Sequence, residues 1–391
     1  MALNNNQCAT LINSAVAQAL GAPIQQLTLQ GIIDTGNDST IIGTRDNFTK
    51  ALISQITTRY FTDSSYRSEY KDEFFVDSSE WGAIISAISI DMPVAEESHA
   101  WQDFTTPDKT VGTYKVYIPV VNEQLFGKSN SWEINITITD EQWNTAFKSA
   151  DELANFVNYI FIVVDNSVMV HREEMNMMNR NNFIAEKISY SKAHVGEGIH
   201  VVNLVEMYAK LTGKTALTVN EFLTDEKALR FAVGKIKLFS KYMQKINTQF
   251  NTAGRSRFTP SDRMVVQILT DFMTAIETVS LSTAFNANFV NISDYSTVPY
   301  WQSTNKFDFD SVSSINVKIA SDGTAVDQSG IVAFMCDKWA IRHTIKKHRV
   351  AVHRADPEEL TTYFNQSRDM YINDLTMNAI VFVVTDYTAA A

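Results

Sequence analysis

One stretch of this chain decides which folds are possible. It is residues 151–188, which read DELANFVNYIFIVVDNSVMVHREEMNMMNRNNFIAEKI. The stretch contains no glycine and no proline, and its apolar side chains recur at intervals that match a helix. That spacing predicts one continuous helix. At a rise of 1.5 Å per residue the helix would be about 57 Å long, which is enough to cross a whole domain.

Strand patterns precede this helix. Alternating apolar side chains at 114–120 and again at 132–138 predict two half-buried strands. Between 99 and 112 the chain is polar, so we interpret residues 70–138 as a long β-hairpin excursion with a wide tip. Residues 1–62 are rich in Asn and Gln and weakly patterned, which favours an extended arm over a core.

The chain after residue 190 mixes helical and strand signals. Thr218 and Glu221 have the spacing of a capping box, and 225–250 carries an amphipathic stripe. Two more helices are predicted, one from Thr259-Pro260 to about residue 276 and one from Asp356-Pro357 to about residue 372. Strands are predicted at 315–319, 331–335 and 378–384. The resulting fold class is α+β.

The composition excludes several classes of protein. The 391 residues include 45% hydrophobic and 20% charged residues, which is typical of a globular chain and not of a disordered one. Glycine (14) and proline (7) are too few for a collagen-like or linker-dominated chain. The net charge of −11 argues against a dedicated DNA or membrane-surface binder.

The sequence predicts no targeting segment. Its start lacks a basic region followed by an apolar core, so we expect no signal peptide. The most apolar stretch, 156–170, is too short and too polar to span a bilayer. Two cysteines, Cys8 and Cys336, do not form a disulfide framework, and we expect reduced thiols in a cytosolic setting.

Motifs for catalysis or cofactors are weak. Gly213-Lys214-Thr215 resembles the end of a phosphate-binding loop, but that loop needs a glycine where Tyr208 stands. Three histidines, at 343, 348 and 353, are spaced by five residues, and neither a helix nor a strand brings such a set onto one ion. We therefore expect no cofactor, no metal site and no catalytic residues.

Two groups of residues are candidates for contacts. A basic strip stands out on the acidic chain; it consists of Arg342, Lys346, Lys347, Arg349 and Arg354. It is interpreted either as a solvated face or inter-subunit salt-bridge strip, or as a contact for nucleic-acid phosphates. Trp101 and Phe104, at the tip of the excursion, are candidate anchors on a neighbouring subunit, or they pack back on their own hairpin.

The order of these parts resembles a known family. Three stretches carry the resemblance: Ile136-Thr137-Ile138-Thr139-Asp140-Glu141 ahead of the long helix, Gly330-Ile331-Val332-Ala333-Phe334-Met335-Cys336-Asp337-Lys338-Trp339-Ala340, and Asn378-Ala379-Ile380-Val381-Phe382-Val383. With the polar arm, the hairpin excursion and the long helix, they resemble the major capsid proteins of tailed bacteriophages with the Hong Kong 97 phage fold. The nearest resemblance is to those of small, short-tailed phages of Gram-positive hosts.

The resemblance implies a division of the chain. Residues 1–62 would be the N-terminal arm and 63–138 the extended loop. Residues 139–190 together with 351–391 would form the peripheral domain with its spine helix, and 191–350 the axial domain. In some relatives a Lys and an Asn form an isopeptide crosslink assisted by a Glu. Lys109 and Lys128 lie in the excursion, but no catalytic Glu can be assigned, so no crosslink is expected.

The implied function is structural. A major capsid protein self-assembles, as hexamers and pentamers, into the icosahedral head shell that encloses the double-stranded DNA genome. The implied partners are scaffolding protein, portal and, weakly and non-specifically, the packaged DNA, with no membrane. The expected location is the virion, and the host cytoplasm during assembly. Two alternatives remain at this stage: an α+β enzyme with scattered catalytic residues, or a non-shell structural protein of a tail or surface layer.

Overall fold

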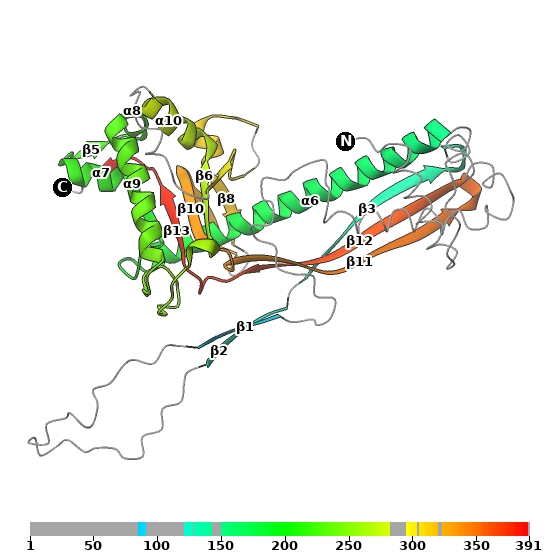
Figure 1. The fold of residues 1–391 in the computed structure, drawn as a ribbon, viewed down its shortest axis with the longest axis horizontal. Coiled ribbons are helices and arrows are strands. Elements are labelled where there is room, and N and C mark those ends of the chain that lie inside the picture. The colour runs from blue at the N-terminus through cyan, green and yellow to red at the C-terminus, as the bar shows by residue number, and fades with distance from the viewer. Residues whose placement is uncertain are drawn as a thin grey trace, which may run out of the picture. The chain divides into compact units, whose positions relative to one another are not determined.

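The computed structural model describes residues 85–90, 121–127, 129–142, 150–281, 295–302, 305–319 and 323–389. These ranges divide into two compact units. Unit 1 takes Ser129–Arg180 and Arg342–Tyr371, and unit 2 takes Gly82–Lys128, Asn181–Ile341 and Ile372–Ala391 (Figure 1). Each unit is described by itself below.

The long helix expected at 151–188 is α6, Ala150–Ala193, with 44 residues. Its residues up to Arg180 belong to unit 1 and those from Asn181 to unit 2. Among the side chains that repeat at helical spacing, Ile160, Val164 and Ile188 are buried. None of the helices in the described ranges combines the length and the hydrophobicity needed to cross a membrane.

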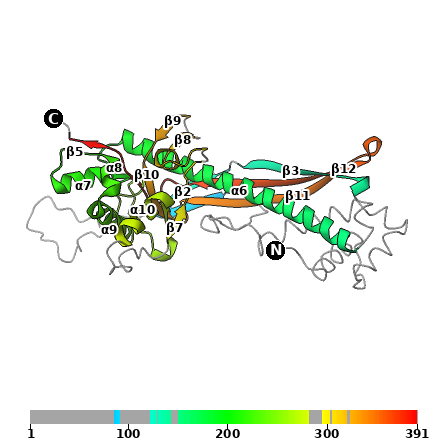
Figure 2. The same cartoon turned by 90° about the horizontal axis from the view of Figure 1, so that it is seen from above.

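Unit 1 is built on a three-stranded sheet with the order β11–β12–β3. The strands are β11, Ile341–Ala355; β12, Leu360–Asn373; and β3, Asn130–Thr139, which pairs antiparallel with β12. A short 3-10 helix, Asp356–Glu358, joins β11 to β12. Helix α6 lies along one face of this sheet, as both views of the fold show (Figures 1 and 2).

Strand β12 corrects one prediction. The Asp356-Pro357 sequence was expected to start a helix that reaches residue 372, but only the 3-10 turn forms there and the chain continues as a strand. From Thr361 to Asp369 every second side chain of β12 is buried, which is the period of a strand with one covered face. Pairing with β3 along ten residues overrides the helix-start signal.

Unit 2 is built on a five-stranded sheet with the order β4–β13–β10–β6–β7. The strands are β4 (Val201–Asn203), β13 (Ala379–Val383), β10 (Ile331–Asp337), β6 (Met264–Leu269) and β7 (Tyr295–Val298). β10 pairs antiparallel with both β13 and β6. The two outer pairs, β13–β4 and β6–β7, are parallel. All residues of β10 and β13 are buried, so these strands form the centre of the core.

Helices accompany this sheet. They are α7 (Leu204–Thr212), α8 (Val219–Thr224), α9 (Glu226–Met243), α10 (Thr270–Leu281) and the short α11 (Phe309–Val312). The predicted capping box is present at the start of α8, where the Thr218 hydroxyl accepts from the Glu221 N–H and the Glu221 carboxylate accepts from the Thr218 N–H. The predicted 225–250 helix is α9, which ends earlier, at Met243.

The helix predicted to begin at Thr259-Pro260 is only partly present. A 3-10 turn, Ser261–Arg263, is followed by strand β6, and α10 begins only at Thr270. In β6 five consecutive side chains are buried, because β10 and β7 flank it inside the sheet. A short run that is apolar on both faces has no period that separates a buried strand from a buried helix, which explains the error.

The unit boundaries also differ from the predicted ones. Residues 351–391 were grouped with 139–190, but β13 pairs between β10 and β4, so Ile372–Ala391 belongs to unit 2. The excursion predicted over 63–138 is shorter at its C-terminal end, because β3 pairs with β12 in unit 1. Its described hairpin consists of β1, Ile85–Ile90, and β2, Val121–Phe126, paired antiparallel. The predicted arm, 1–62, and the predicted strand at 114–120 lie outside the described residues.

Two smaller ladders complete unit 2. Strand β8, Ile315–Lys318, pairs antiparallel with β9, Ala325–Gln328, and β5, Ala216–Leu217, pairs with β14, Tyr387–Thr388. The Trp301 side chain is fully buried next to β10, and its Nε1 donates to the Ile331 carbonyl at 2.7 Å. Cys336 is buried and takes part in no disulfide within the described ranges, while Cys8 lies outside the described residues.

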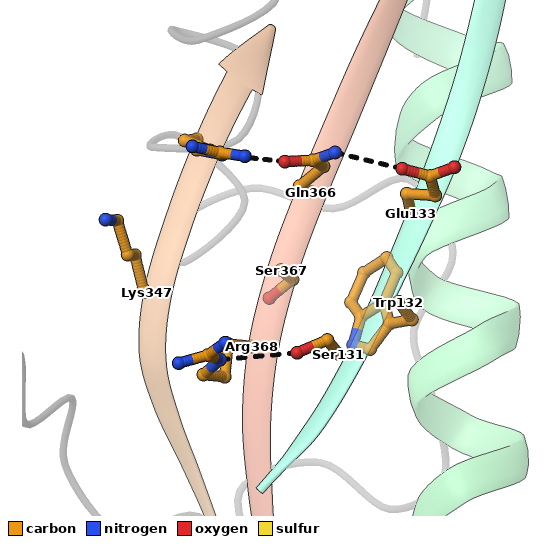
Figure 3. A pocket seen from close by; sticks show the side chains of 8 residues that line it. Ser131, Trp132, Glu133, Lys347, Gln366, Ser367 and Arg368 are labelled. Carbon is orange, nitrogen blue, oxygen red and sulfur yellow. Dashed lines mark hydrogen bonds between the residues drawn. The ribbon is translucent and has the colours of Figure 1, made fainter. Parts of the chain in front are cut away.

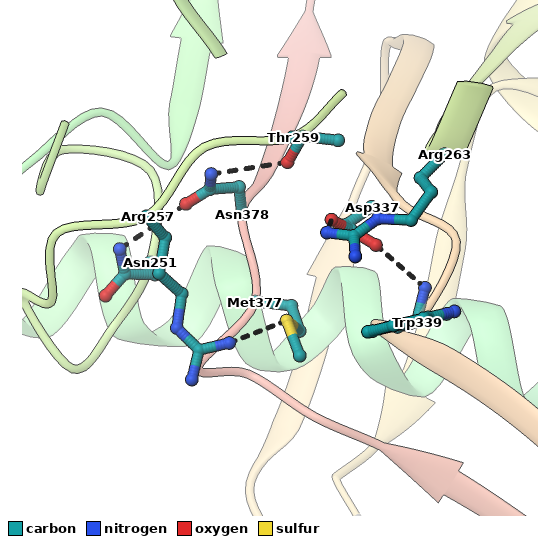
Figure 4. A network of polar contacts seen from close by, with 8 residues as sticks. All are labelled: Asn251, Arg257, Thr259, Arg263, Asp337, Trp339, Met377 and Asn378. Atoms are coloured by element: carbon teal, nitrogen blue, oxygen red, sulfur yellow. Dashed lines mark hydrogen bonds and ion pairs between the residues drawn. The ribbon is translucent and has the colours of Figure 1, made fainter. Parts of the chain in front are cut away.

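A polar network closes the end of β10 (Figure 4). Arg263 Nη2 lies 2.8 Å from Asp337 Oδ2, and the same guanidinium stacks over the Trp339 ring at 4.2 Å. Asp337 Oδ1 also accepts from the Trp339 N–H. Beside it, Asn378 donates to the Thr259 hydroxyl. The network therefore joins the turn before β6 to the ends of β10 and β13.

Gly330 directly precedes strand β10 of the five-stranded sheet. We expect it to be the position around this sheet that is least tolerant of a side chain. Its φ is 73°, and an added Cβ would overlap the Val384 carbonyl. We predict that Gly330→Ala lowers the free energy of unfolding by at least about 1–3 kcal/mol, because strain adds to the overlap. Urea unfolding of the soluble subunit measures the change.

Gly234→Ala is the matched control for this substitution. Gly234 lies in the middle of α9, and nothing stands within 4 Å of an added Cβ. We expect this variant to gain about 0.5–1 kcal/mol, because alanine loses less backbone entropy in a helix. Equal effects at the two glycines would contradict the assignment of Gly330 as a close backbone approach.

Lys187 makes the stability of unit 2 depend on pH. Its side chain is fully buried in α6, and Nζ donates to the carbonyls of Phe250 and Leu375 at 3.3 Å each. Burial lowers the pKa of Lys187 from 10.5 to about 7, although the charge of Asp374 acts in the opposite direction. Between these two values the unfolded chain binds a proton that the folded chain has lost, so stability rises with pH across this window.

We therefore predict that Lys187→Met removes this rise. The free energy of unfolding, measured by urea titration from pH 6 to pH 10, should increase less steeply in the variant than in the wild type. Lys192→Met, at an exposed position in the last turn of the same helix, should leave the slope unchanged. Identical slopes for Lys187→Met and the wild type would show that Lys187 does not lose its proton in the folded state.

Candidate assembly surfaces

The predicted basic strip is split by the geometry of strand β11. Lys346 is buried at 9% exposure and Arg342 is partly covered, while Lys347, Arg349 and Arg354 are exposed. Arg354 Nη2 lies 3.5 Å from Asp140 Oδ2. Neighbouring side chains of a strand point to opposite faces, so residues adjacent in sequence do not share one surface. Three of the five predicted residues therefore remain as surface cations.

Arg368 of β12 joins Lys347 and Arg349 on the outer face of the unit 1 sheet. Figure 3 shows the arrangement across the three strands. Arg349 Nε donates to Gln366 Oε1 at 2.6 Å, and Gln366 Nε2 donates to Glu133 Oε2 at 3.0 Å. Arg368 Nε donates to the Ser131 hydroxyl at 3.3 Å. These bonds cross from β11 through β12 to β3 and hold the side chains flat against the sheet.

A shallow hollow of about 420 Å³ opens over this face. Lys347, Arg349 and Arg368 line it, and Glu133 is the one carboxylate among the lining residues. Three cations against one anion leave the hollow positively charged. Guanidinium groups of this kind bind carboxylates and phosphates through paired N–H donors. The sheet therefore presents a surface suited to an acidic partner.

The inner face of the same sheet contains a buried polar cluster centred on Asp369. Its carboxylate accepts from Trp132 Nε1 at 2.9 Å and from the Ser367 hydroxyl at 2.8 Å. His343 Nε2 lies 3.4 Å away, and Arg172 Nε of α6 lies 3.7 Å away. Burial raises the pKa of Asp369, but the His343 contact and the Arg172 charge outweigh it, so that the pKa lies below its usual value.

The three histidines at 343, 348 and 353 take separate roles. The His343 ring stacks on Tyr371, with centroids 4.6 Å apart. His348 Nε2 bonds with Asn365 Oδ1, and burial lowers the pKa of the ring. His353 is exposed. Within the described ranges no group of three or more His, Cys, Asp or Glu side chains is arranged to hold a metal ion.

Two other sequence candidates can be placed. Gly213, in the Gly213-Lys214-Thr215 motif, is the C-cap of α7 with a φ of 70°, and its N–H donates to the Ala209 carbonyl. The motif therefore ends a helix, whereas a phosphate-binding loop would begin one. Trp101, Phe104, Lys109 and Lys128 lie outside the described residues, so the proposed anchors and the crosslinking question stay predictions.

The described part of the excursion exposes an apolar face. In the β1–β2 hairpin Ile90 pairs with Val121, and Ile88 and Leu125 lie on the same side. All four side chains are 59–65% exposed. On the other side Ser89 accepts a hydrogen bond from Arg255 at 2.7 Å. One face of the hairpin therefore contacts Arg255 of the same unit, and the other face is exposed among the described residues.

Some of these residues could not have been found from the sequence. Arg368 and Gln366 were assigned to a predicted helix, and Glu133 and Ser131 to a free hairpin. Alternation within each stretch was visible, but the pairing of β12 with β3, across more than 220 residues, was not. Only that pairing brings the four side chains onto one face.

Comparison with known proteins now identifies the chain. A family model for the Phi29-like phage major capsid protein matches residues 10–383. The chain belongs to this family. It is a phage major capsid protein, a structural subunit of the head shell, and it resides in the virion capsid. Capsid proteins of this kind associate with copies of themselves. No curated protein matches the chain.

One solved capsid structure shows a similar fold. The capsid structure of Staphylococcus phage Andhra matches with a TM-score of 0.54 and 9% sequence identity, over 82% of this chain and 85% of that one. The capsid structure of the cyanophage P-SCSP1u gives a TM-score of 0.44 at 9% identity, over 83% of this chain and 90% of that one. The α+β class and the capsid prediction are confirmed.

We predict that Asp369→Asn lowers the free energy of unfolding by about 3–5 kcal/mol, because the buried Arg172 charge loses a carboxylate partner. Urea unfolding followed by tryptophan fluorescence would report it, since Trp132 contacts the cluster. The pKa of Asp369 is lower in the folded protein than in the unfolded chain. The stability that Asp369 contributes is therefore fully present above its unfolded pKa and is lost as the pH falls through its folded pKa.

Asp140→Asn is the control for this prediction. The pair of Asp140 with Arg354 is partly exposed, at 21% and 42%, and the expected loss is within about 1 kcal/mol. If Asp369→Asn costs no more than Asp140→Asn, the cluster does not hold the sheet of unit 1 to α6.

Proposed function

We propose that this protein assembles, as hexamers and pentamers, into a closed icosahedral head shell around double-stranded DNA. Membership of the major capsid protein family is the observation that carries the proposal. Its role in this proposal is structural, without a catalytic step, and assembly takes place in the host cytoplasm. Scaffolding protein and portal are the proposed partners during assembly.

The exposed hairpin face supports self-assembly. Four large apolar side chains, Ile88, Ile90, Val121 and Leu125, gather on one side of a two-stranded ladder. Isolated two-stranded hairpins are marginally stable in water, and an apolar face of this kind gains stability when another surface covers it. We propose that the cover is a neighbouring subunit, with Trp101 and Phe104 as further anchors beyond the hairpin.

The basic hollow on unit 1 supports an acidic contact. Subunits with a net charge of −11 repel one another over their whole surface, so a local cationic face favours specific contacts between copies. The same face makes contact with DNA phosphates at most weak and non-specific, because few cations are involved. We propose a salt-bridge strip between subunits as its main role.

Electron microscopy tests the proposed function. The purified or co-expressed protein in negative stain should show closed polyhedral shells. Sheets or tubes would favour a tail or surface-layer protein. Compact monomers or dimers, in the presence of every other phage head component, would argue against a shell subunit.

Substitutions in the hairpin test the proposed cover. We predict that Ile90→Asn with Val121→Asn reduces shell yield at least about tenfold, since the pair loses apolar area at an interface. Shell yield is measured by sedimentation and microscopy. The urea midpoint of the soluble subunit should stay unchanged, because both side chains are already exposed in the single chain.

Val195→Asn is the control for the hairpin variant. Val195 is 87% exposed in the turn after α6 and lies outside the hairpin. It should assemble like the wild type. Wild-type shell yield from the hairpin variant would show that the apolar face is not covered on assembly.

A further inference from the structure

The basic hollow on unit 1 contains three cations that form no ion pair with the described residues. Its lining residues all belong to unit 1, and they include Lys347 and Arg349 of β11 and Arg368 of β12. All three side chains are exposed. No described carboxylate lies within ion-pair distance of any of them. The hollow therefore concentrates positive charge that the described residues do not neutralise.

Hydrogen bonds across the sheet fix both guanidinium groups. Arg368 stands opposite Ser131 in the ladder between β12 and β3, and its Nε donates to the Ser131 hydroxyl at 3.3 Å. Arg349 Nε donates to Gln366 Oε1 at 2.6 Å. Each contact uses Nε, so within the described ranges the terminal Nη groups of both arginines have no hydrogen-bond partner. The two planar groups are therefore held in place with donors available to a ligand.

Lys347 lies beside Arg368 on the same face of the sheet (Figure 3). Strands β11 and β12 are neighbours joined through the 3-10 helix Asp356–Glu358, so they run antiparallel. Because Arg349 bonds with Gln366, the residues two positions along each strand, Lys347 and Arg368, are also cross-strand neighbours. Like charges in such a pair repel each other. An anion bound between them removes this repulsion.

Glu133, the one carboxylate of the lining, is bound by amides. Its Oε2 accepts from Gln366 Nε2 at 3.0 Å, and its Oε1 accepts from Asn135 Nδ2 at 3.4 Å. Because Gln366 bonds with Glu133 on one side and with Arg349 on the other, its amide separates the carboxylate from that cation. Three cations and one carboxylate leave the lining with a charge of +2. A ligand that neutralises the hollow therefore carries at least two negative charges.

The spacing of the cations selects an extended anion. Lys347 and Arg349 are two residues apart on β11, which separates their Cα atoms by about 6–7 Å. A carboxylate has both of its oxygens on one carbon, whereas a chain of linked phosphates places charged oxygens along such a distance. Arginine binds phosphate oxygens through paired N–H donors. Ser131 accepts from Arg368, so its own O–H can donate to a further phosphate oxygen.

A short anion fits this site better than a DNA duplex does. The hollow has a volume of about 420 Å³, which lies in the range of small-ligand sites. DNA binding draws its affinity from many phosphate contacts along an extended cationic surface. Three cations on a chain with a net charge of −11 provide few such contacts.

We propose that the basic hollow binds a free oligophosphate, a linear anion of at least two linked phosphate groups. The Nη groups of Arg349 and Arg368 and the Lys347 Nζ donate to its oxygens, and the Ser131 hydroxyl donates to one more. This small-molecule site goes beyond the proposed function. It belongs to the free subunit, whereas the salt-bridge strip proposed above forms on assembly.

Calorimetry of the full-length soluble subunit tests the proposal, with inorganic triphosphate as the probe. At an ionic strength of about 50 mM, where surface charges are weakly screened, we expect one site per subunit. Lys347→Gln with Arg368→Gln should weaken binding at least about tenfold, because two of the three cations are lost. Lys241→Gln with Lys245→Gln, which removes the same charge at exposed positions of unit 2, should bind like the wild type. No saturable binding by the wild type, or an equal loss in both variants, would overturn the proposal.

Chemical labelling locates the bound anion. An acetylating reagent modifies exposed lysines, and mass spectrometry measures the rate at each one. Saturating triphosphate should slow the acetylation of Lys347 severalfold, because its ammonium group contacts the anion, and should leave the rate at Lys241 unchanged. Equal rates at Lys347 with and without triphosphate would show that the anion binds elsewhere, and the site would be wrong.

Two further probes identify the source of the anion. A short DNA duplex and tetraglutamate, titrated at the same ionic strength, should each bind more weakly than triphosphate. Tighter binding of the duplex would assign the hollow to packaged DNA, and equal binding of tetraglutamate would assign it to acidic protein segments. Either result would overturn the oligophosphate site.

The outcomes separate this proposal from the proposed function, because binding is measured on the soluble subunit and shells are observed by microscopy. Shells from a wild-type protein that does not bind triphosphate would remove the site and leave the shell function standing. Triphosphate binding without shells would support the site and argue against the shell function.

Discussion

The backbone hydrogen bonds of β10 are the constraint on which unit 2 depends. All seven residues of this strand are buried, so its N–H and C=O groups have no access to water and need partners on both sides. β6 supplies them on one side and β13 on the other. Strand β6 ends 62 residues before β10 begins, and β13 comes from the last stretch of the chain. The sheet therefore forms only when segments that are distant in the sequence meet. Gly330 is required at the start of the strand because the Val384 backbone passes too close for a side chain.

A different balance holds unit 1 together. The covered face of its sheet is partly polar, with Asn365, Ser367 and Asp369 buried on β12. Such a face is stable only when each buried group has a partner, and Trp132, His343 and Arg172 provide partners for the central carboxylate. Polar pairing of this kind adds less net stability than apolar packing of the same size, but it fixes one arrangement of helix and strands. Neighbouring copies in a shell need matching surfaces, so a single fixed arrangement of helix and strands suits a shell subunit.

The surfaces of the chain follow from these two units. Alternation in β11 and β12 sends Lys347, Arg349 and Arg368 outward while it buries Lys346 and Asp369. Helix α9 shows the same division in helical form, with Phe239 and Met243 inside and Lys241 and Tyr242 outside. The hairpin β1–β2 differs, because its apolar side is the exposed one. In a family of capsid proteins, exposed apolar and cationic faces on an acidic chain are the features that repeated copies can use for contact.

The sequence by itself determined the elements whose local pattern has no competitor. The long helix α6 follows from 38 residues without glycine or proline, the buried strand β10 from its apolar run, and the start of α8 from the Thr218–Glu221 capping box. The order of these elements was also enough to indicate the capsid family. Only the tertiary structure decided β6 and β12, where helix-start signals lost to pairing with β10 and β3. It alone also decided that Ile372–Ala391 joins unit 2 and that Arg368 faces the basic hollow. The physical reason is that strand pairing acts between residues far apart in the chain, whereas helical periodicity and caps act within a few residues.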